Sequence, residues 1–427
     1  MDRPRTAAEN RRVVAATTIG TAIEWYDFFL YAAVAGLVFN QVMFGQLDAG
    51  PATIVSFLSV GLSFLFRPLG AVLAGHFSDR SGRRIVLMVT LIAMGGATTA
   101  IGLLPTYDSI GLAAPLLLVF FRIIQGISAG GEWGSAVLLA VEHAPVDKRG
   151  LFGAGPQSGA PAGLLLSSGM LALMNVVAPG DAFIEWGWRM PFLLSIVLMF
   201  VGWWIRRGVD ESPVFENMRG VSRSPLRSLL RDHWRKVLVA ALVFAGNGTV
   251  GYMVAGGYIQ SYGSTQLGME RGVVLWAVTG AAVAWLFSTV LAGALSDRIG
   301  RRATYLGGFV FQFGAAAALF PLVNTGEVAW LWAAMLLLGT ALGLTYGQQA
   351  AMYAELFPAP VRGSGTSLTY ALGAILGGAF APTIAAALVQ STGSTYSVTV
   401  YLCVATAVGF LAAASLQDRT GVPLDTD

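Results

Sequence analysis

Twelve apolar segments, each close to the length that crosses a lipid bilayer, dominate this chain. A helix needs about 20 consecutive apolar residues to span the hydrocarbon core. Backbone polar groups find no water there, so a spanning segment must satisfy them internally. We therefore predict an all-α integral membrane protein with twelve transmembrane helices, near residues 13–39, 53–77, 85–104, 112–139, 150–177, 190–206, 237–262, 270–295, 303–323, 328–353, 363–389 and 396–416.

The amino-acid composition supports a membrane protein and excludes several other functions. Of 427 residues, 55% are hydrophobic and 11% are charged, whereas about 25% are charged in a soluble domain. The single cysteine, Cys403, lies in an apolar run and cannot build a disulfide framework. The three histidines lack metal-ligand spacing, and the sequence contains no phosphate-binding loop motif. We expect no metal, no cofactor, no direct use of ATP and no enzyme activity.

The cations are distributed unevenly between the two sides of the predicted bundle. Of the 26 Lys and Arg residues, 22 lie in segments on the side that also holds the N-terminus. The four others are Arg67, Arg122, Arg189 and Arg271. Lys and Arg are retained on the cytoplasmic side of a membrane. We therefore predict a plasma membrane protein with both termini in the cytoplasm. The same scatter over many loops explains the net charge of +3 without a nucleic-acid partner, which would need one basic face.

Two internal matches indicate a duplication. The stretch Gly75-His-Phe-Ser-Asp-Arg-Ser-Gly-Arg-Arg84 recurs as Gly293-Ala-Leu-Ser-Asp-Arg-Ile-Gly-Arg-Arg302, and Glu142-His-Ala-Pro-Val-Asp-Lys-Arg-Gly150 recurs as Glu355-Leu-Phe-Pro-Ala-Pro-Val-Arg-Gly363. We predict two pseudo-symmetric six-helix bundles, residues 1–206 and 237–427, joined by a cytoplasmic linker at 207–236. In proteins built this way, substrate binds near mid-membrane between the halves.

These repeated motifs resemble those of the major facilitator superfamily, which implies transport by alternating access. Four further stretches resemble the metabolite:proton symporter family, and the first half is most similar to its shikimate-type members. The resemblance covers nearly the whole chain. It implies a small organic acid or zwitterion as substrate, such as shikimate, 2-oxoglutarate, citrate, proline or betaine. The four stretches are Glu24-Trp-Tyr-Asp-Phe-Phe-Leu-Tyr31, Phe66-Arg-Pro-Leu-Gly70, Arg122-Ile-Ile-Gln-Gly-Ile-Ser-Ala-Gly-Gly-Glu-Trp-Gly134 and Trp186-Gly-Trp-Arg-Met-Pro-Phe192.

The repeated turn also has a physical role of its own. Glycine allows helices to approach closely and to turn tightly, and Asp and Arg can pair across helix ends. We predict a cytoplasmic gate that sets the conformational equilibrium without touching substrate, with Glu142 paired to Arg149 and Glu355 to Arg362. The alternative is that the arginines only anchor the chain at the membrane surface. The predicted gate residues are Gly75, Asp79, Arg80, Gly82, Arg83, Glu142, Arg149, Gly293, Asp297, Arg298, Gly300, Arg301, Glu355 and Arg362.

Away from the ends of the predicted spans, five charged residues lie inside them, all in the first half: Glu24, Asp27, Arg67, Arg122 and Glu132. A charge at the bilayer centre costs at least about 2.5–3.5 kcal/mol, so such residues usually face a cavity or a partner. We predict that Asp27 or Glu24, with Glu132 as a further candidate, carries a transported proton while Arg122 holds a substrate carboxylate. The alternative is a permanent Asp27–Arg122 ion pair that only holds two spans together.

Other polar and aromatic side chains in the spans are predicted to complete the substrate site. The predicted function is proton-driven symport of a small organic acid by a monomer in the lipid bilayer. Three alternatives stay open: symport of a zwitterion such as betaine or proline, an uncoupled facilitator, and a channel or transporter-like sensor. The sequence does not distinguish H⁺ from Na⁺ as the coupling ion. The additional predicted contacts are Gln125, Arg67, Tyr26, Gln157, Asn247, Tyr252, Gln348, Gln349 and Tyr370.

Overall fold

The computed structural model describes the backbone of residues 7–81, 83–130, 132–142, 144–207 and 225–424. Within these ranges, the side chains of residues 7–16, 72, 74–81, 83–87, 132, 135, 205–207 and 225–228 lie outside the described part.

Helices make up both halves of the chain. The first half contains α1 (Ala7–Val34), η1 (Ala35–Phe39), α2 (Asn40–Val42), α3 (Ala49–Ser81), α4 (Arg83–Leu103), α5 (Tyr107–Ile110), α6 (Ala113–Ala129), α7 (Glu132–Glu142), η2 (Val146–Lys148), α8 (Arg149–Gln157), α9 (Gly159–Val177), η3 (Phe183–Gly187) and α10 (Arg189–Arg207). The second half contains α12 (Pro225–Asp232), α13 (Trp234–Ala255), α14 (Tyr258–Ser261), η5 (Tyr262–Gln266), α15 (Arg271–Ile299), α16 (Arg301–Val323), α17 (Val328–Leu344), α18 (Gln349–Leu356), η6 (Ala359–Val361), α19 (Arg362–Gly373), η7 (Ala374–Gly378), α20 (Ala381–Thr392) and α21 (Tyr396–Ser415).

Ten helical segments among the described residues are long and apolar enough to cross a bilayer. Two shorter apolar helices, Met88–Leu103 and Ala113–Ala129, complete the set. These segments correspond one for one to the predicted spans, so the prediction of an all-α membrane protein with twelve spans is confirmed. In the part of the predicted linker that the structure describes, residues 225–236, α12 is a short helix and α13 begins directly behind it at Trp234.

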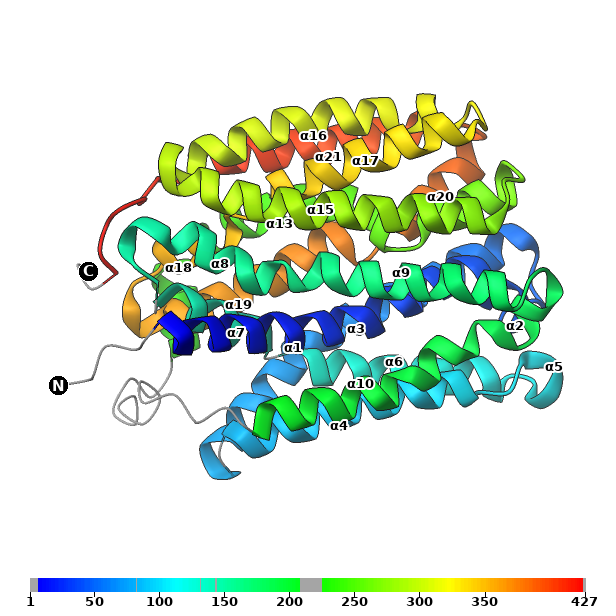
Figure 1. Ribbon diagram of the computed structural model, residues 1–427, viewed down its shortest axis with the longest axis horizontal. Coiled ribbons are helices and arrows are strands. Elements are labelled where there is room, and N and C mark those ends of the chain that lie inside the picture. The colour runs from blue at the N-terminus through cyan, green and yellow to red at the C-terminus, as the bar shows by residue number, and fades with distance from the viewer. Residues whose placement is uncertain (1–6, 82, 131, 143, 208–224, 425–427) are drawn as a thin grey trace.

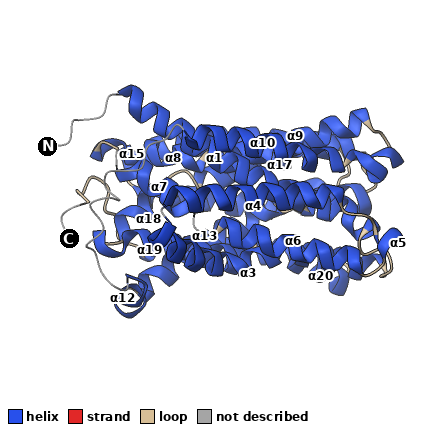
Figure 2. Ribbon diagram, turned by 90° about the horizontal axis from the view of Figure 1, so that it is seen from below, coloured by secondary structure: helices blue, strands red, loops and turns tan. Residues whose placement is uncertain are grey.

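The long helices lie side by side, and α1 begins at the end of the bundle where α21 finishes (Figure 1). We name this the basal end and the opposite one the distal end. Figure 2 shows α12, α18 and α19 at the basal end as well. That this end faces the cytoplasm stays a prediction.

Several spans are broken instead of continuous. α8 gives way to α9 at Ser158, because Pro161 has no N–H to donate to the Gln157 carbonyl oxygen. α13 ends before Gly257, whose φ of +80° suits a glycine. α17 and α18 are separated by a turn that ends at Gln348. Irregular backbone at membrane depth is tolerated where protein buries it, and these breaks leave polar groups inside the bundle.

The two halves meet through small residues. α15 packs against α8 and α9, while α3 packs against α20. Toward the distal end, a Cβ added to Gly36 would lie 2.6 Å from the carbonyl oxygen of Gly257. Toward the basal end, a Cβ on Gly293 would lie 2.7 Å from the carbonyl oxygen of Gly150. The halves therefore touch near both ends of their interface in this conformation.

Candidate transport site and charged gate

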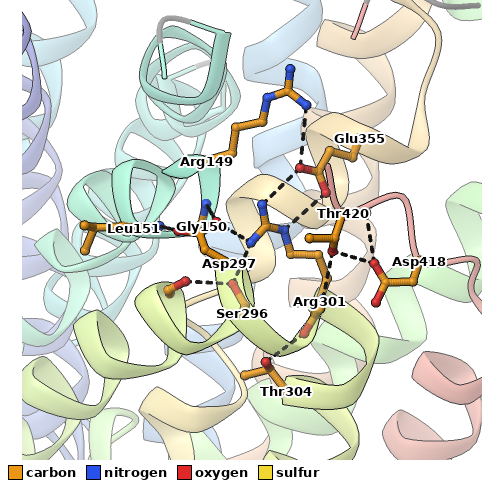
Figure 3. Close-up of polar contacts among 12 residues, drawn as sticks. Arg149, Gly150, Leu151, Ser296, Asp297, Arg301, Thr304, Glu355, Asp418 and Thr420 are labelled. Carbon is orange, nitrogen blue, oxygen red and sulfur yellow. Dashed lines mark hydrogen bonds and ion pairs between the residues drawn. The ribbon is translucent and has the colours of Figure 1, made fainter. Parts of the chain in front are cut away.

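Arg301 is the centre of a buried cluster at the basal end (Figure 3). Its side chain is 1% exposed and donates to Asp297 Oδ1 at 2.7 Å and to the two carboxylate oxygens of Glu355 at 3.2 Å each. Ser296 Oγ accepts a further hydrogen bond from Arg301 at 2.8 Å. Buried ions need this degree of pairing to offset the loss of hydration. The cluster joins α15, α16 and α18.

Asp297 also links the two halves. Its Oδ1 accepts a hydrogen bond from the Gly150 amide at 2.7 Å, and its Oδ2 accepts one from the Leu151 amide at 2.8 Å. Both amides lie at the start of α8, where N–H groups lack intrahelical partners and the helix dipole favours negative charge. A carboxylate of the second half therefore caps a helix of the first half (Figure 3).

The second repeated motif pairs across the halves. Glu142 Oε1 lies 3.5 Å from Arg362 Nη1, and Arg149 Nη1 lies 3.9 Å from Glu355 Oε1. We predicted pairs within each motif, Glu142 with Arg149 and Glu355 with Arg362, and that pairing is wrong. The two copies of the motif face each other at the interface, so each acid contacts the arginine of the opposite copy.

The structure describes the side chains of the second copy of the repeated turn but not those of the first copy. In the second copy, Gly300 has a φ of +95° and Arg298 is exposed at the basal surface. The predicted gate residues of the first copy fall outside the described side chains or residues: Gly75, Asp79, Arg80, Gly82 and Arg83.

Arg122 is held by protein groups. Its side chain is buried, and its guanidinium carbon lies 3.9 Å from the ring centroid of Tyr31. Four hydrogen bonds use most of the five donors of a guanidinium. The acceptors are the carbonyl oxygens of Ser59 at 3.2 Å and Val60 at 2.8 Å, Ser63 Oγ at 2.7 Å and Gln125 Oε1 at 2.8 Å.

Asp27 lies apart from Arg122, and no ion pair joins these two described residues. Ser195 Oγ donates instead to Asp27 Oδ1 at 2.6 Å. The alternative of a permanent Asp27–Arg122 pair is therefore not what the structure shows. Gln125, which accepts a hydrogen bond from Arg122, donates through Nε2 to Thr98 Oγ1 at 2.8 Å, and the Thr98 hydroxyl donates to the Met94 carbonyl oxygen at 3.0 Å.

A small cavity inside the first half borders both Asp27 and Glu24, which are buried. Its volume of about 10 Å³ leaves room for about one water molecule. Ser128 and Ser195 contribute hydroxyl groups to its wall. A water molecule there could contact the buried acids from within the first half. The side chain of Glu132, the third predicted acid, lies outside the described part.

Arg67 faces aromatic rings. Its guanidinium carbon lies 4.5 Å from the ring centroid of Phe64, 5.4 Å from that of Trp25 and 5.5 Å from that of Phe28. Among the described residues, its buried Nε has no hydrogen-bond partner. Tyr252 of the second half covers the same region, with its ring 5.6 Å from Phe64. Arg67 therefore lies near the interface between the halves with a donor left over for a ligand.

Buried polar atoms of the second half also lack partners within the described part of the chain: Tyr252 OH, Trp285 Nε1, Gln348 Oε1 and both amide atoms of Gln349. Nearly all buried polar atoms in proteins are paired, so each such atom points to a ligand or water. Sequence reasoning missed Trp285, whose ring lies 6.3 Å from that of Phe29 in the first half. Its only signal is a large amphipathic ring within an apolar span.

Two predicted contact residues are engaged within their own halves. Tyr26 OH donates to the carbonyl oxygen of Pro191 at 2.8 Å, and Asn247 Nδ2 donates to Thr345 Oγ1 at 2.5 Å. The structure does not bring either polar group to the region around Arg67.

Gln157 and Tyr370 take part in contacts between the halves. Gln157 accepts a hydrogen bond from Trp133 Nε1 at 2.9 Å and donates to the carbonyl oxygen of Tyr346 at 3.2 Å. Trp133 stacks on Tyr370 with 3.7 Å between ring centroids. Gln157 belongs to α8 and Trp133 to α7, two helices of the basal half of the bundle. Their contacts therefore close the interface between the halves on the basal side of Arg67 and its aromatic neighbours.

Two helical halves with a charged gate and buried charges near their interface define a class, the secondary transporters. The family model described as Major Facilitator Superfamily matches residues 17–382. The chain belongs to the major facilitator superfamily, and within it to the family of metabolite transporters that includes the shikimate and proline/betaine transporters. It is a multi-pass membrane transporter and not an enzyme.

Relatives and solved structures agree with this assignment. The inner membrane metabolite transport protein YhjE of Escherichia coli strain K12 is 38% identical, over 90% of this chain and 88% of that protein. The shikimate transporter of the same strain is 37% identical, over 96% and 94%. The glycine betaine/proline/ectoine/pipecolic acid transporter of Dickeya dadantii is 33% identical, over 97% and 84%. A structure of a proton:xylose symporter shares the fold, with a TM-score of 0.77 and 18% identity over 99% and 98% of the two chains.

Proposed function

We propose that this transporter is a proton-coupled symporter of a small organic acid, that one chain forms the whole site, and that its basal end faces the cytoplasm. The observation that carries the proposal is the set of two buried arginines and two buried acids in the first half. Arg67 and Arg122 contribute +2, and ionised Glu24 and Asp27 contribute −2. One bound proton leaves +1, which a monoanion offsets. Because unbalanced buried charge is costly, proton and anion favour each other's binding.

Arg67 binds the substrate carboxylate in this proposal. Its Nε has no partner among the described residues, whereas Arg122 already donates four hydrogen bonds to protein groups. The two guanidinium groups share one aromatic neighbour, because their carbon atoms lie 5.5 Å and 5.2 Å from the ring centroid of Phe28. Arg122 therefore adds positive potential to the site while it holds α3 and α6 together.

Asp27 carries the proton. Asp27 and Glu24 both border the small cavity inside the first half, so a water molecule there can deliver a proton to the Asp27 carboxylate. Ser195 holds Oδ1 from α10. Arg122 and Asp27 have separate hydrogen-bond partners, so protonation of Asp27 changes the charge of the site without breaking an ion pair with Arg122.

A zwitterion is the second candidate substrate, because relatives named as betaine and proline transporters are 31–33% identical to this chain. A quaternary ammonium is bound by the faces of aromatic rings. Here the Arg67 guanidinium already covers the rings of Phe64, Trp25 and Phe28. An anion therefore suits this conformation of the site better than a betaine.

The test is uptake by purified protein in proteoliposomes, with imposed pH or sodium gradients. Radiolabelled shikimate, a simple monocarboxylate, a dicarboxylate, proline and glycine betaine are compared. We expect saturable accumulation of a monocarboxylate that requires an inward proton gradient and disappears with a protonophore. Accumulation of betaine alone, or flux that ignores the proton gradient, contradicts the proposal and supports the zwitterion, sodium or facilitator alternatives.

Two variants sharpen this assay. Asp27→Asn should retain exchange of substrate across the membrane and lose uphill accumulation, because the site keeps its shape and loses its proton carrier. Ser195→Ala serves as the matched control, since it removes the hydrogen-bond donor at Asp27 and keeps the carboxyl group. A channel or a sensor would show neither saturation nor accumulation in the wild-type protein.

A further inference from the structure

The chain stays on the bundle after α21 ends at Ser415. Leu416 is extended, with φ −79° and ψ 145°, and its side chain is buried. Residues 416–424 then run along the basal end, in red in Figure 1. Nine residues in extended form can reach about 30 Å, enough to cross from one helix end to another.

The first anchor of this segment is the start of α16. Asp418 Oδ2 accepts a hydrogen bond from the Arg302 amide at 3.0 Å, and Thr420 Oγ1 accepts one from the Arg301 amide at 3.1 Å. Asp418 Oδ1 in turn accepts hydrogen bonds from Thr420, from Oγ1 at 2.5 Å and from its amide at 3.0 Å. A Cβ on Gly300 would lie 2.6 Å from Asp418 Oδ2. The glycine of the repeated turn therefore makes room for a cap supplied by the C-terminal segment.

A turn then redirects the segment. The Val422 amide donates to the Arg419 carbonyl oxygen at 3.1 Å, and Gly421 has a φ of +81°. A positive φ at the third residue of a four-residue turn is the mark of a type II turn, which favours glycine. The turn fixes the direction of the carbonyl groups that follow it.

Those carbonyl groups are the second anchor. Arg149 Nη1 donates to the Val422 carbonyl oxygen at 2.7 Å, and Arg362 Nη2 donates to the Leu424 carbonyl oxygen at 2.8 Å. Arg149 belongs to the first half, and Arg362 to the second. The same two arginines pair with the gate acids Glu355 and Glu142. The segment is thus tied to α16 at one point and to the opposite half at another.

We propose that residues 416–424 form a strap that holds the gate shut at the basal end and must release Arg149 each time that end opens. When the halves separate there, Arg149 moves away from α16, so the Val422 hydrogen bond cannot persist while Asp418 remains on the cap. The strap therefore adds stability to the closed gate alone. This role of the strap depends only on contacts at the gate, and it does not depend on which substrate or coupling ion is transported.

The test measures the gate directly, by electron spin resonance distances across the basal end in lipid nanodiscs. Spin labels are placed at Asp147→Cys and Ala359→Cys, both exposed, in a Cys403→Ser background. A chain that ends at Thr420 keeps the cap and loses both carbonyl anchors, while a chain that ends at Leu424 keeps the cap and both anchors. We expect the ratio of long to short distances to rise roughly tenfold in the shorter chain only, since charge-assisted hydrogen bonds are among the stronger ones. Equal distributions in the two chains overturn the proposal.

A point variant guards against poor folding of the shortened chain. A Cβ on Gly421 would meet nothing within 4 Å, so Gly421→Ala acts only through its positive φ. It should raise the same ratio several-fold. Gly393→Ala is the matched control, because Gly393 has a φ of +67° in open space beyond α20 at the distal end. An equal response of the two alanine variants, or no response to Gly421→Ala, contradicts the strap.

Discussion

Glu142 of the first half lies 3.5 Å from Arg362 of the second, so the acid of one repeated motif pairs with the arginine of the other. The reciprocal contact, Arg149 with Glu355 at 3.9 Å, completes the exchange. A duplicated motif thus holds the halves together at the basal end. Moving the halves apart breaks both pairs at once, which suits a gate better than a surface anchor.

The crossed pairing predicts which residues are energetically coupled. In double-mutant cycles of thermal unfolding, Glu142→Gln and Arg362→Gln should show a coupling of about 0.5–1 kcal/mol, at the low end for contacting residues because Glu142 is partly exposed. Glu142→Gln and Arg149→Gln should be additive within about 0.5 kcal/mol. The reverse pattern would restore the pairing within each motif.

Asp297 is predicted to be the most sensitive residue of the gate. Asp297→Ala removes one of the two carboxylate partners of buried Arg301 and the acceptor for two amides of α8. Arg301 stays paired with Glu355, but each hydrogen bond to a charged group contributes about 1.5–3 kcal/mol, so we expect a clear drop in melting temperature and a gate shifted toward opening. Its exposed neighbour supplies the control, and Arg298→Ala should change stability by no more than about 0.5 kcal/mol.

The two buried arginines should respond differently to replacement. Arg67→Gln should abolish saturable substrate binding and lower the melting temperature of the empty protein less than Arg122→Gln does, because Arg67 Nε has no partner among the described residues. Arg122→Gln should lower the melting temperature without substrate, because it leaves buried acceptors of α3 unpaired. Melting temperatures measured with and without substrate separate the two effects. If Arg122→Gln abolished substrate binding and Arg67→Gln did not, Arg122 would be the residue that binds the substrate carboxylate.

The contact between the halves at the distal end should require a glycine at position 257. Gly257 has a φ of +80°, and a Cβ there would collide with the carbonyl oxygen of Ala32 in α1. We expect Gly257→Ala to force the halves apart at the distal end, seen as a lengthened distance between labels placed there. Gly307→Ala is the control in α16, because nothing lies within 4 Å of its Cβ position, and it should be neutral or slightly stabilising.

The strap should not respond to pH in the physiological range. Burial acts to raise the pKa of Asp418, but hydrogen bonds from the hydroxyl and amide of Thr420 and from the Arg302 amide outweigh it and hold the pKa below its ordinary value. A depressed carboxyl pKa gives stability that is complete above the unfolded value, about 3.9, and is lost as pH falls through the folded value. The difference in melting temperature between wild type and Asp418→Asn should be constant from pH 6 to 8 and shrink below about pH 4. A change between pH 6 and 8 would contradict this.

Much of the architecture could be predicted, because each span is a property of one local stretch. Hydropathy and length alone define the apolar helices, and the first-half location of Glu24, Asp27, Arg67 and Arg122 can be read directly along the chain. The contents of the site could not be predicted in the same way. The sequence predicts that Arg122 binds a substrate carboxylate, but its guanidinium donates to carbonyl groups of α3. Those contacts depend on how α3 and α6 pack together, which no local pattern encodes.

The sequence by itself determined the membrane class, the twelve spans, the duplication and the family, since each depends on local composition or on motifs within a few turns of helix. Only the tertiary structure decided that Glu142 faces Arg362, that Arg67 keeps an unused donor beside Tyr252, and that Asp418 reaches the turn at Gly300. Those contacts join residues more than a hundred positions apart. They follow from the way the halves and the C-terminal segment pack, and no local pattern encodes that packing.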